Sequence, residues 1–195
     1  NDQLERKIAK KNKLEIELRE AVKNEDFSVF YQPQVSIKTG DICAVEALAR
    51  WKNKEGIYIS PSIFIPLAEE IDVIKDIDKI ILRKAFSEAE DFLKSKKIKL
   101  ALNLSIKQFL DKEYIEFLRQ YDNLYEFLEI EITENAALNN LKNSIEIIKE
   151  YKNLGVKIAI DDFGVGYSSL SHVKDLPIDK IKIEKSFIDN IVSSK

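Results

Sequence analysis

The sequence predicts an α/β protein built on a mainly parallel sheet. Short apolar segments alternate along the chain with longer segments of helical periodicity. The apolar segments carry hydrophobic residues on both faces, which is typical of strands covered by helices. Doubly wound sheets and (β/α)8 barrels both satisfy this pattern. Polar residues recur at the carboxyl ends of several predicted strands, as they do in barrel active sites, and this favours the barrel.

Six strands are predicted, at 28–35, 42–51, 100–104, 128–133, 157–161 and 180–183. Helices are predicted at 4–23, 61–70, 77–95, 106–121, 141–154 and 168–174. Gly40 lies between the first two strands and indicates a hairpin, so the first strand is expected to be antiparallel to the second.

The composition of the 195 residues suits one soluble domain, with 45% hydrophobic and 33% charged residues. A net charge of -3 gives no attraction to a nucleic acid polymer. No apolar run reaches the roughly 20 residues that span a membrane, so we expect no membrane contact. The single Cys43 excludes an internal disulfide, fits a cytoplasmic location and is expected to be a small core residue.

The chain contains no Met, so we expect it to be a piece of a longer protein. Residues 1–13 are so rich in charge that they are predicted to form a helical connector from an upstream domain. Residues 14–195 are then the globular domain.

A metal site built on imidazole or thiolate is nearly excluded, because the chain has one His and one Cys. His172 is expected to be structural, in a surface helix. Any metal would be held by Asp, Glu and Asn oxygens, which favours Mg²⁺ or Mn²⁺.

Several polar residues lie inside or just after predicted strands, where a buried charge needs a partner or a metal. They are Gln32, Glu46, Arg50, Asn103, Glu131, Asp161, Asp162 and Lys182. Strand alternation places Glu46, Leu48 and Arg50 on one face. Asp161 and Asp162 can reach one site only if the chain leaves the strand there, and the glycines at 164 and 166 would allow this.

Each of these residues also has a purely structural interpretation. Glu46 could pair with Arg50, Asn103 could cap a helix, the two aspartates could be turn residues, and Lys182 could be a charge on an edge strand. Their coincidence at five strand ends instead favours one site, in which metal ions lie beside a phosphate group.

At these residues the sequence resembles the EAL domain family, from about Leu14 to the end. The motifs occur in the family's order: Tyr31-Gln32-Pro33, Glu46-Ala47-Leu48 with Arg50-Trp51, Phe64-Ile65-Pro66-Leu67-Ala68-Glu69, Asn103-Leu104-Ser105, Glu131-Ile132-Thr133-Glu134, Asp161-Asp162-Phe163-Gly164 with Gly166-Tyr167-Ser168-Ser169-Leu170, and Leu176-Pro177-Ile178-Asp179. The single tripeptides are common, but the ordered set is specific.

The resemblance implies a modified (β/α)8 TIM-like barrel that hydrolyses cyclic di-GMP to linear pGpG with two Mg²⁺ or Mn²⁺ ions. It implies that the first metal is bound by Glu46, Asn103, Glu131 and Asp161, and the second by Asp161 and Asp162. It also implies that Lys182 contacts the nucleophilic water and that Glu134 orders the segment 162–170. The substrate-binding residues that it implies are Gln32, Leu48 and Arg50. Lys182, Glu46 and Glu134 are therefore the catalytic candidates. The segment 162–170 and its neighbouring helix are the family's usual dimer surface, so a homodimer is expected.

The chain departs from the family in three ways. Glu184 stands where the family usually has Asp, and Val165 where it usually has Thr. A barrel of this type needs roughly 250 residues, so about the last two β/α units are expected to be lacking. These units would carry the presumed catalytic base, so a protein ending at Lys195 is expected to associate through its open side and to be inactive. For the parent protein we expect an upstream sensory or GGDEF-type domain and phosphodiesterase activity. The alternatives are an inactive EAL-type cyclic di-GMP receptor and a dimerising signal-relay domain, and the presence of every ligand in the covered region favours the enzyme.

Overall fold

The computed structural model describes residues 2–164 and 173–188. By its internal contacts the chain forms two compact units. Unit 1 comprises Asn1–Gln32 and Ala47–Glu90, and unit 2 comprises Pro33–Glu46 and Asp91–Lys195.

The strands belong to one mainly parallel sheet, which confirms the predicted α/β class. They are β1 (Phe27–Val35), β2 (Ile42–Lys52), β3 (Tyr58–Ile59), β4 (Lys99–Asn103), β5 (Leu128–Thr133), β6 (Lys157–Phe163) and β7 (Lys180–Ile183). Their order is β1-β2-β4-β5-β6-β7, and β3 pairs with β2. Pairing is parallel from β4 through β7. Over the described ranges, hydrogen bonds do not close this sheet into a barrel.

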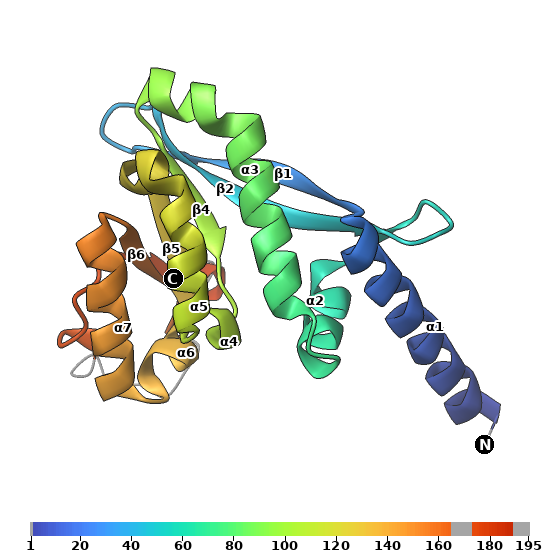
Figure 1. Ribbon diagram of the computed structural model, residues 1–195. Helices are drawn as coiled ribbons and strands as arrows, with labels where there is room; N and C mark the ends of the chain where they lie inside the picture. Colours follow the sequence, from blue (N-terminus) through green and yellow to red (C-terminus); the bar gives the residue numbers. More distant parts are fainter. Residues whose placement is uncertain (1, 165–172, 189–195) are drawn as a thin grey trace, which may run out of the picture. The chain divides into compact units, whose positions relative to one another are not determined.

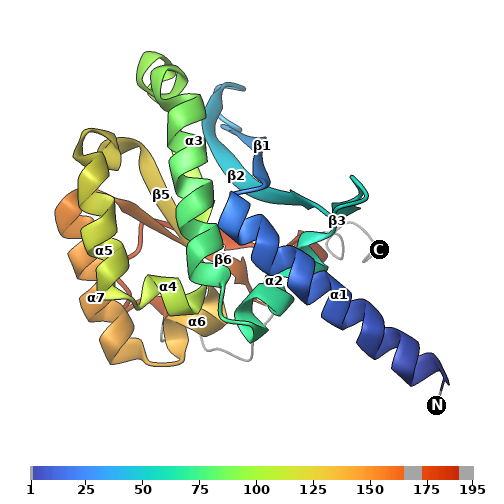
Figure 2. The same ribbon diagram turned by 45° about the vertical axis from the view of Figure 1, so that its right-hand side comes forward.

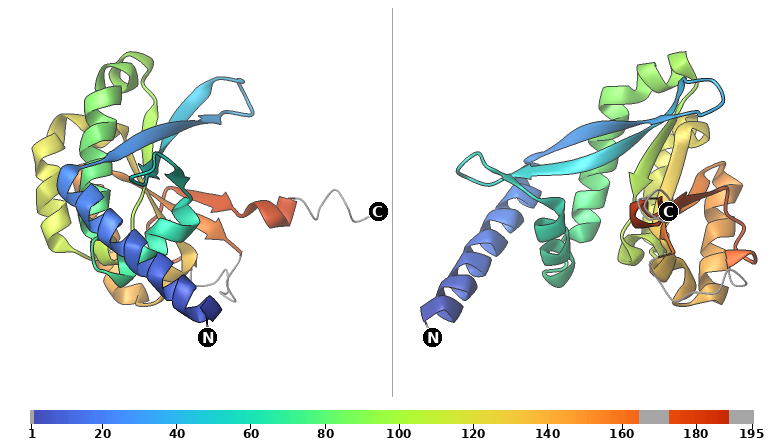
Figure 3. Two further views of the ribbon diagram at one scale, coloured as in Figure 1. Left: turned by 90° about the vertical axis from the view of Figure 1, so that its right-hand side faces the viewer. Right: turned by 180° about the vertical axis from the view of Figure 1, so that it is seen from behind.

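The first two strands form a hairpin, visible in Figure 3. Only residues 36–41 separate β1 from β2, too few for a parallel crossover, so β1 is antiparallel as expected. The turn is closed by Ser36 N–H donating to Asp41 O at 2.9 Å and Gly40 N–H donating to Ser36 O at 2.8 Å. Gly40 has φ 76°, a left-handed conformation that glycine adopts without strain.

Cys43 is exposed, so its expected place in the core was wrong. It is the second residue of β2, next to the exposed Ile42, where the hairpin begins and is not yet covered. Its Sγ lies 3.4 Å from the carbonyl oxygen of Gln34 on the paired strand. The apolar alternation of β2 therefore begins only at Ala44.

In unit 2 the parallel strands are covered by helices. Figures 1 and 2 show α5 (Lys112–Leu118) and α7 (Leu141–Leu154) along one side of β4, β5 and β6. Five of the six residues of β5 are buried, as expected for a strand covered on both faces. Tyr151 of α7 stacks on Phe109 at 5.6 Å between ring centroids, and its hydroxyl donates to Phe109 O at 3.3 Å.

The predicted helix at 106–121 is divided into α4 (Ile106–Phe109), α5 and a 3₁₀ segment, η1 (Arg119–Phe127). Asp111 adopts an extended conformation and its side chain accepts a hydrogen bond from Glu113 N–H, so it starts a new helix. A short helix absent from the sequence prediction, α6 (Glu134–Leu138), is capped in the same way by Thr133. Most of the helix predicted at 168–174, with His172, lies outside the described residues.

Unit 1 combines α1 (Asp2–Asn24), α2 (Pro61–Glu70) and most of α3 (Ile74–Lys96) with parts of β1 and β2. Its aromatic core joins Trp51 to Phe64 at 5.9 Å and Phe64 to Phe27 at 6.3 Å between ring centroids. The helix α1 is continuous through the predicted connector, and it is buried only in its second half, at residues such as Leu18. In the described part of the chain, no helix is both long and apolar enough to cross a membrane.

Candidate metal centre

Three carboxylates converge in unit 2, from three different strands. Glu46 of β2, Glu131 of β5 and Asp161 of β6 each offer an oxygen, and these oxygens lie within 4.8 Å of one another. Asn103, the last residue of β4, is the register partner of Glu131, and its Nδ2 donates to Glu46 Oε1 at 2.7 Å. The structure thus brings together all four side chains predicted to hold the first metal.

The parallel register explains why residues distant in sequence meet here. Asn103 lies opposite Glu131, and Asp161 lies opposite Thr133, two residues beyond Glu131. Positions two apart on a strand share a face, so Glu131 and Asp161 point to the same side of the sheet. Asn103 does not cap the following helix, which was one alternative, because Ser105 accepts from Gln108 N–H in that role.

Lys182 of β7 binds all three carboxylates. Its Nζ donates to Glu46 Oε2 at 3.2 Å, to Asp161 Oδ2 at 2.9 Å, and to Glu131 Oε2. Burial raises the pKa of Glu131, although its hydrogen bond with Lys182 acts in the opposite direction. Burial also disfavours the charge on Lys182, but its bonds to Asp161 and Glu131 outweigh this and raise its pKa above the ordinary value. Lys182 is therefore a protonated internal counter-ion and not a surface charge.

The backbone at Asp161 and Asp162 forms a β-bulge. Ile160 pairs with Ile181 and Phe163 with Ile183, so β6 carries one residue more than β7 between these pairs. Asp162 has φ 53°, which is left-handed. The chain was expected to leave the strand at this point, but β6 continues to Phe163. The bulge, and not an early strand end, changes the direction of the side chains.

Asp162 is not among the three carboxylates that converge. It is exposed, and its backbone N–H donates to Asp161 Oδ1 at 2.9 Å. Partial burial and the neighbouring charge of Asp161 both raise the pKa of Asp162. Its assignment to a second metal ion stays a prediction.

Glu134 lies at the start of α6 and is only 3% exposed. Its Oε2 accepts a hydrogen bond from Gly164 N–H at 2.9 Å, while Oε1 has no partner within the described ranges. This bond holds the beginning of the segment that Glu134 was predicted to order. Gly166 and the rest of that segment, through Leu170, lie outside the described residues.

The three predicted substrate residues, Gln32, Leu48 and Arg50, belong to unit 1. The guanidinium of Arg50 lies over the ring of Phe30, 5.1 Å from its centroid, and Nη1 donates to Ala49 O at 2.9 Å. Glu46 instead binds Asn103 and Lys182, as given above, so the alternative Glu46–Arg50 ion pair is not what holds Glu46.

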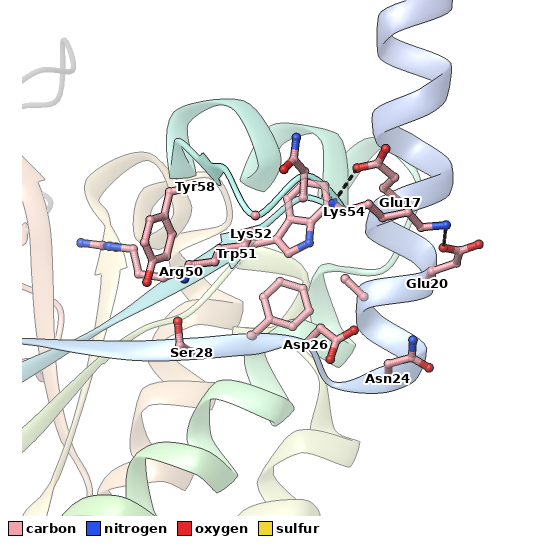
Figure 4. Close-up of a pocket in the computed structure, with 14 residues that line it drawn as sticks. Glu17, Glu20, Asn24, Asp26, Ser28, Arg50, Trp51, Lys52, Lys54 and Tyr58 are labelled. Carbon is pink, nitrogen blue, oxygen red and sulfur yellow. Dashed lines mark hydrogen bonds and ion pairs between the residues drawn. The ribbon is translucent and has the colours of Figure 1, made fainter.

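Arg50 also lines a cavity of about 570 Å³ within unit 1. Figure 4 shows Arg50 and Tyr58 on one side of this cavity and α1 on the other. On the α1 side, Glu20 forms an ion pair with Lys54 at 2.5 Å, and Glu17 accepts from Lys54 N–H at 3.3 Å. Lys54 therefore balances the charge of Glu20 at this wall.

Sequence reasoning missed three residues that adjoin the carboxylates. Gln34 of β1 donates through Nε2 to Glu131 Oε1 at 3.2 Å and accepts from Lys180 Nζ at 2.6 Å. Lys180 in turn donates to Glu129 Oε1 at 2.5 Å. Strand alternation could have found them, since each lies two residues from a residue that was singled out: Gln32, Lys182 or Glu131.

The donor set fits a hard divalent cation. The converging side chains offer carboxylate oxygens and one amide group, and neither imidazole nor thiolate is among them. Such oxygen sets suit Mg²⁺ or Mn²⁺.

The sequence profile described as "EAL domain" matches residues 15–195. The chain belongs to the EAL domain family. It is 41% identical over 182 residues to the Bacillus subtilis signaling protein YkoW, covering 91% of this chain and 23% of YkoW. It is 37% identical over 177 residues to the probable cyclic di-GMP phosphodiesterase PdeB of Escherichia coli, covering 88% of this chain and 34% of PdeB.

Among solved structures, the EAL chain superimposes on the PaMucR phosphodiesterase in its complex with c-di-GMP. The TM-score is 0.83 at 33% identity, over 90% of this chain and 74% of that one. This likeness confirms the predicted fold, part of a TIM-like barrel. The chain spans only 23% and 34% of the lengths of YkoW and PdeB.

Proposed function

We propose that the protein carrying this EAL domain hydrolyses cyclic di-GMP to linear pGpG with Mg²⁺ or Mn²⁺. The single observation that carries the proposal is the convergence of Glu46, Glu131 and Asp161 within 4.8 Å, with Asn103 bound to Glu46 at 2.7 Å. A cluster of carboxylates with one internal cation retains net negative charge, which favours a divalent ion. The likeness to the cyclic di-GMP phosphodiesterases supports the choice of substrate.

In this proposal Glu46, Asn103, Glu131 and Asp161 hold the first ion, and Asp161 with Asp162 contributes to a second. When bound, such ions neutralise a phosphodiester and lower the pKa of a coordinated water. Glu134 fixes the start of the segment after β6 through Gly164 N–H.

Lys182 would act on the attacking water. Its positive charge lies beside the three carboxylates, and once an ion had displaced it from their oxygens it would remain near enough to orient a water oxygen and stabilise negative charge that develops on it. Because its pKa is raised, Lys182 is not a proton acceptor near neutral pH. It is a positioning and electrostatic group, and the base must be supplied elsewhere.

Substrate binding is assigned to Gln32, Leu48 and Arg50. Arg50 is the cation of this group and would bind a phosphate oxygen, which a guanidinium does through directed N–H donors. Its packing on Phe30 fixes its position at the side of a cavity in unit 1. An EAL-type receptor would use these residues without turnover.

Two substitutions in the full-length parent protein separate these functions. Glu46→Ala removes a metal ligand, so we expect kcat to fall by about 10²-fold or more, since the ion supplies several kcal/mol to the transition state. Arg50→Ala removes a phosphate contact and should mainly raise KM or Kd. Lys149→Met, on the exposed side of α7, is the control.

The measurements are initial rates of pGpG formation and calorimetric titration with cyclic di-GMP. Turnover unchanged by Glu46→Ala would show that the carboxylates do not form the catalytic metal centre. Tight binding of cyclic di-GMP by the wild type without pGpG formation would identify a receptor instead of an enzyme.

We also propose that the parent protein is a bacterial signalling protein with a sensory or GGDEF-type domain and that its EAL domains form a homodimer. The additional domain is supported by the observation that this chain matches only 23% and 34% of the lengths of YkoW and PdeB, whereas the homodimer stays a prediction. Analytical ultracentrifugation of the full-length protein tests the dimer.

A further inference from the structure

We infer that Gln34, fixed by Lys180, is a positioning residue for the metal ligand Glu131. The inference rests on the proposed metal centre and adds to it a support that no motif identified. Four side chains carry it, in the order Glu129, Lys180, Gln34 and Glu131, all within unit 2.

The four side chains are linked by a continuous chain of hydrogen bonds. Glu129 Oε1 accepts from Lys180 at 2.5 Å, and Lys180 also donates to Gln34 Oε1 at 2.6 Å. Gln34 then donates through Nε2 to Glu131 Oε1 at 3.2 Å. Every donor in this chain of hydrogen bonds faces an acceptor.

The orientation of the Gln34 amide is determined by its two neighbours. An amide has a carbonyl oxygen that only accepts and an NH₂ that only donates. Turned over, it would place the NH₂ against the ammonium of Lys180 and the oxygen against the carboxylate of Glu131. Both contacts would be repulsive, so Lys180 at one end compels Gln34 to donate at the other.

The two oxygens of Glu131 are held from different sides. Gln34 holds Oε1 and Lys182 holds Oε2, while Glu131 itself is 1% exposed. A buried carboxylate fixed at both oxygens has little rotational freedom. Partners of this kind orient metal ligands, and their loss typically costs 10- to 100-fold in metal affinity.

The strands make this chain of hydrogen bonds possible. Glu129 and Glu131 lie two residues apart on β5, and Lys180 and Lys182 two apart on β7, so each pair shares a face. Ala159 of β6 is in register with both Glu131 and Lys180. Its methyl group leaves space through which the β7 lysines reach the β5 glutamates.

The test uses Mn²⁺ alone, measured by electron paramagnetic resonance of free Mn²⁺ during titration of the full-length protein. Gln34→Met keeps the length of the side chain and removes the donor, so the Mn²⁺ Kd should rise about 10-fold or more. Gln120→Met, at an exposed glutamine of η1, is the matched control and should leave Kd unchanged.

A double-mutant cycle distinguishes positioning from general destabilisation. Lys180→Met should weaken Mn²⁺ binding in the wild type but have little further effect in the Gln34→Met background, because it acts through Gln34. Additive effects of the two substitutions, or an unchanged Kd in Gln34→Met, would overturn the inference. Failure of the wild type to bind Mn²⁺ would instead overturn the proposed metal centre, on which the inference depends.

Discussion

Lys182→Met tests whether the charge of Lys182 holds together the three carboxylates of Glu46, Glu131 and Asp161. The substitution keeps an unbranched side chain of similar length and removes the ammonium that binds Glu46, Glu131 and Asp161. Three carboxylates with oxygens within 4.8 Å then lack their internal counter-ion. In a chelator such as EDTA, we expect the domain to lose stability.

The magnitude follows from burial. Removing one partner of a buried ion pair costs about 3–5 kcal/mol. The side chain of Glu131 is 0% exposed, whereas those of Lys182 and Asp161 are 21% and 22% exposed, so solvent screens part of the interaction. We therefore expect the lower end, about 3 kcal/mol. For a domain of this size that corresponds to a decrease in Tm of about 6–12 °C.

Adding Mg²⁺ or Mn²⁺ provides the second half of the test. In the wild type the ion must displace the ammonium of Lys182 from the carboxylate oxygens, whereas in Lys182→Met no ammonium binds these oxygens. Metal should therefore raise the Tm of the variant more than that of the wild type, in proportion to ln(1 + [metal]/Kd). Differential scanning calorimetry across a metal titration measures both effects, and Lys149→Met is the control.

Two results would refute this reasoning. A Tm in EDTA equal to that of the wild type would show that Lys182 does not hold the carboxylates together. An equal gain in Tm on adding metal would show that the ion and the ammonium do not compete for the same oxygens.

Three further predictions concern other parts of the domain. Gly164→Ala should lower Tm, because Gly164 has φ 105° and a Cβ would lie 2.7 Å from the ring of Phe187; adding Phe187→Leu should recover only the part due to the clash. Burial raises the pKa of Asp179, but hydrogen bonds such as that from Lys157 outweigh it, so the folded-state pKa is lowered. The charged Asp179 therefore stabilises the fold above pH about 4, and this stability is lost as pH falls through the folded pKa. In Asp179→Asn the free energy of unfolding should depend less on pH in that acidic range. Cys43 should react with a thiol reagent in the native state at a rate near that of a free thiol, and slow labelling would contradict its exposure.

The sequence was sufficient to predict six of the seven described strands, all but the two-residue β3, and the cluster of carboxylates, because both depend on periodicity. Segments with hydrophobic residues on both faces predicted the positions of β4, β5 and β6. Parallel pairing of these strands then brings their polar carboxyl ends to the same edge of the sheet. The convergence of Asn103, Glu131 and Asp161 follows from this register. The ordered motifs were specific enough to predict the family.

Features that depend on local geometry could not be predicted in the same way. The bulge at Asp162 arises because β6 has one residue more than β7 between two register pairs. Hydrophobic periodicity along one strand does not reveal such a difference between two strands. The break at Asp111 interrupts an apolar pattern that continues on both sides of it. Strand alternation could have placed Gln34 on the face of Gln32, but it could not have shown that Gln34 binds Lys180, which is 146 residues away.

The most direct test of the proposed function is the fate of cyclic di-GMP incubated with the full-length protein. Its products can be separated by liquid chromatography and identified by mass, with Mg²⁺ or Mn²⁺ and then with EDTA, for the wild type and Glu131→Gln. We predict that the wild type forms linear pGpG with metal, that EDTA stops the reaction, and that Glu131→Gln forms none under either condition. Cyclic di-GMP that stays intact with metal, or pGpG formed at equal rates by Glu131→Gln, would contradict a catalytic metal centre at these carboxylates.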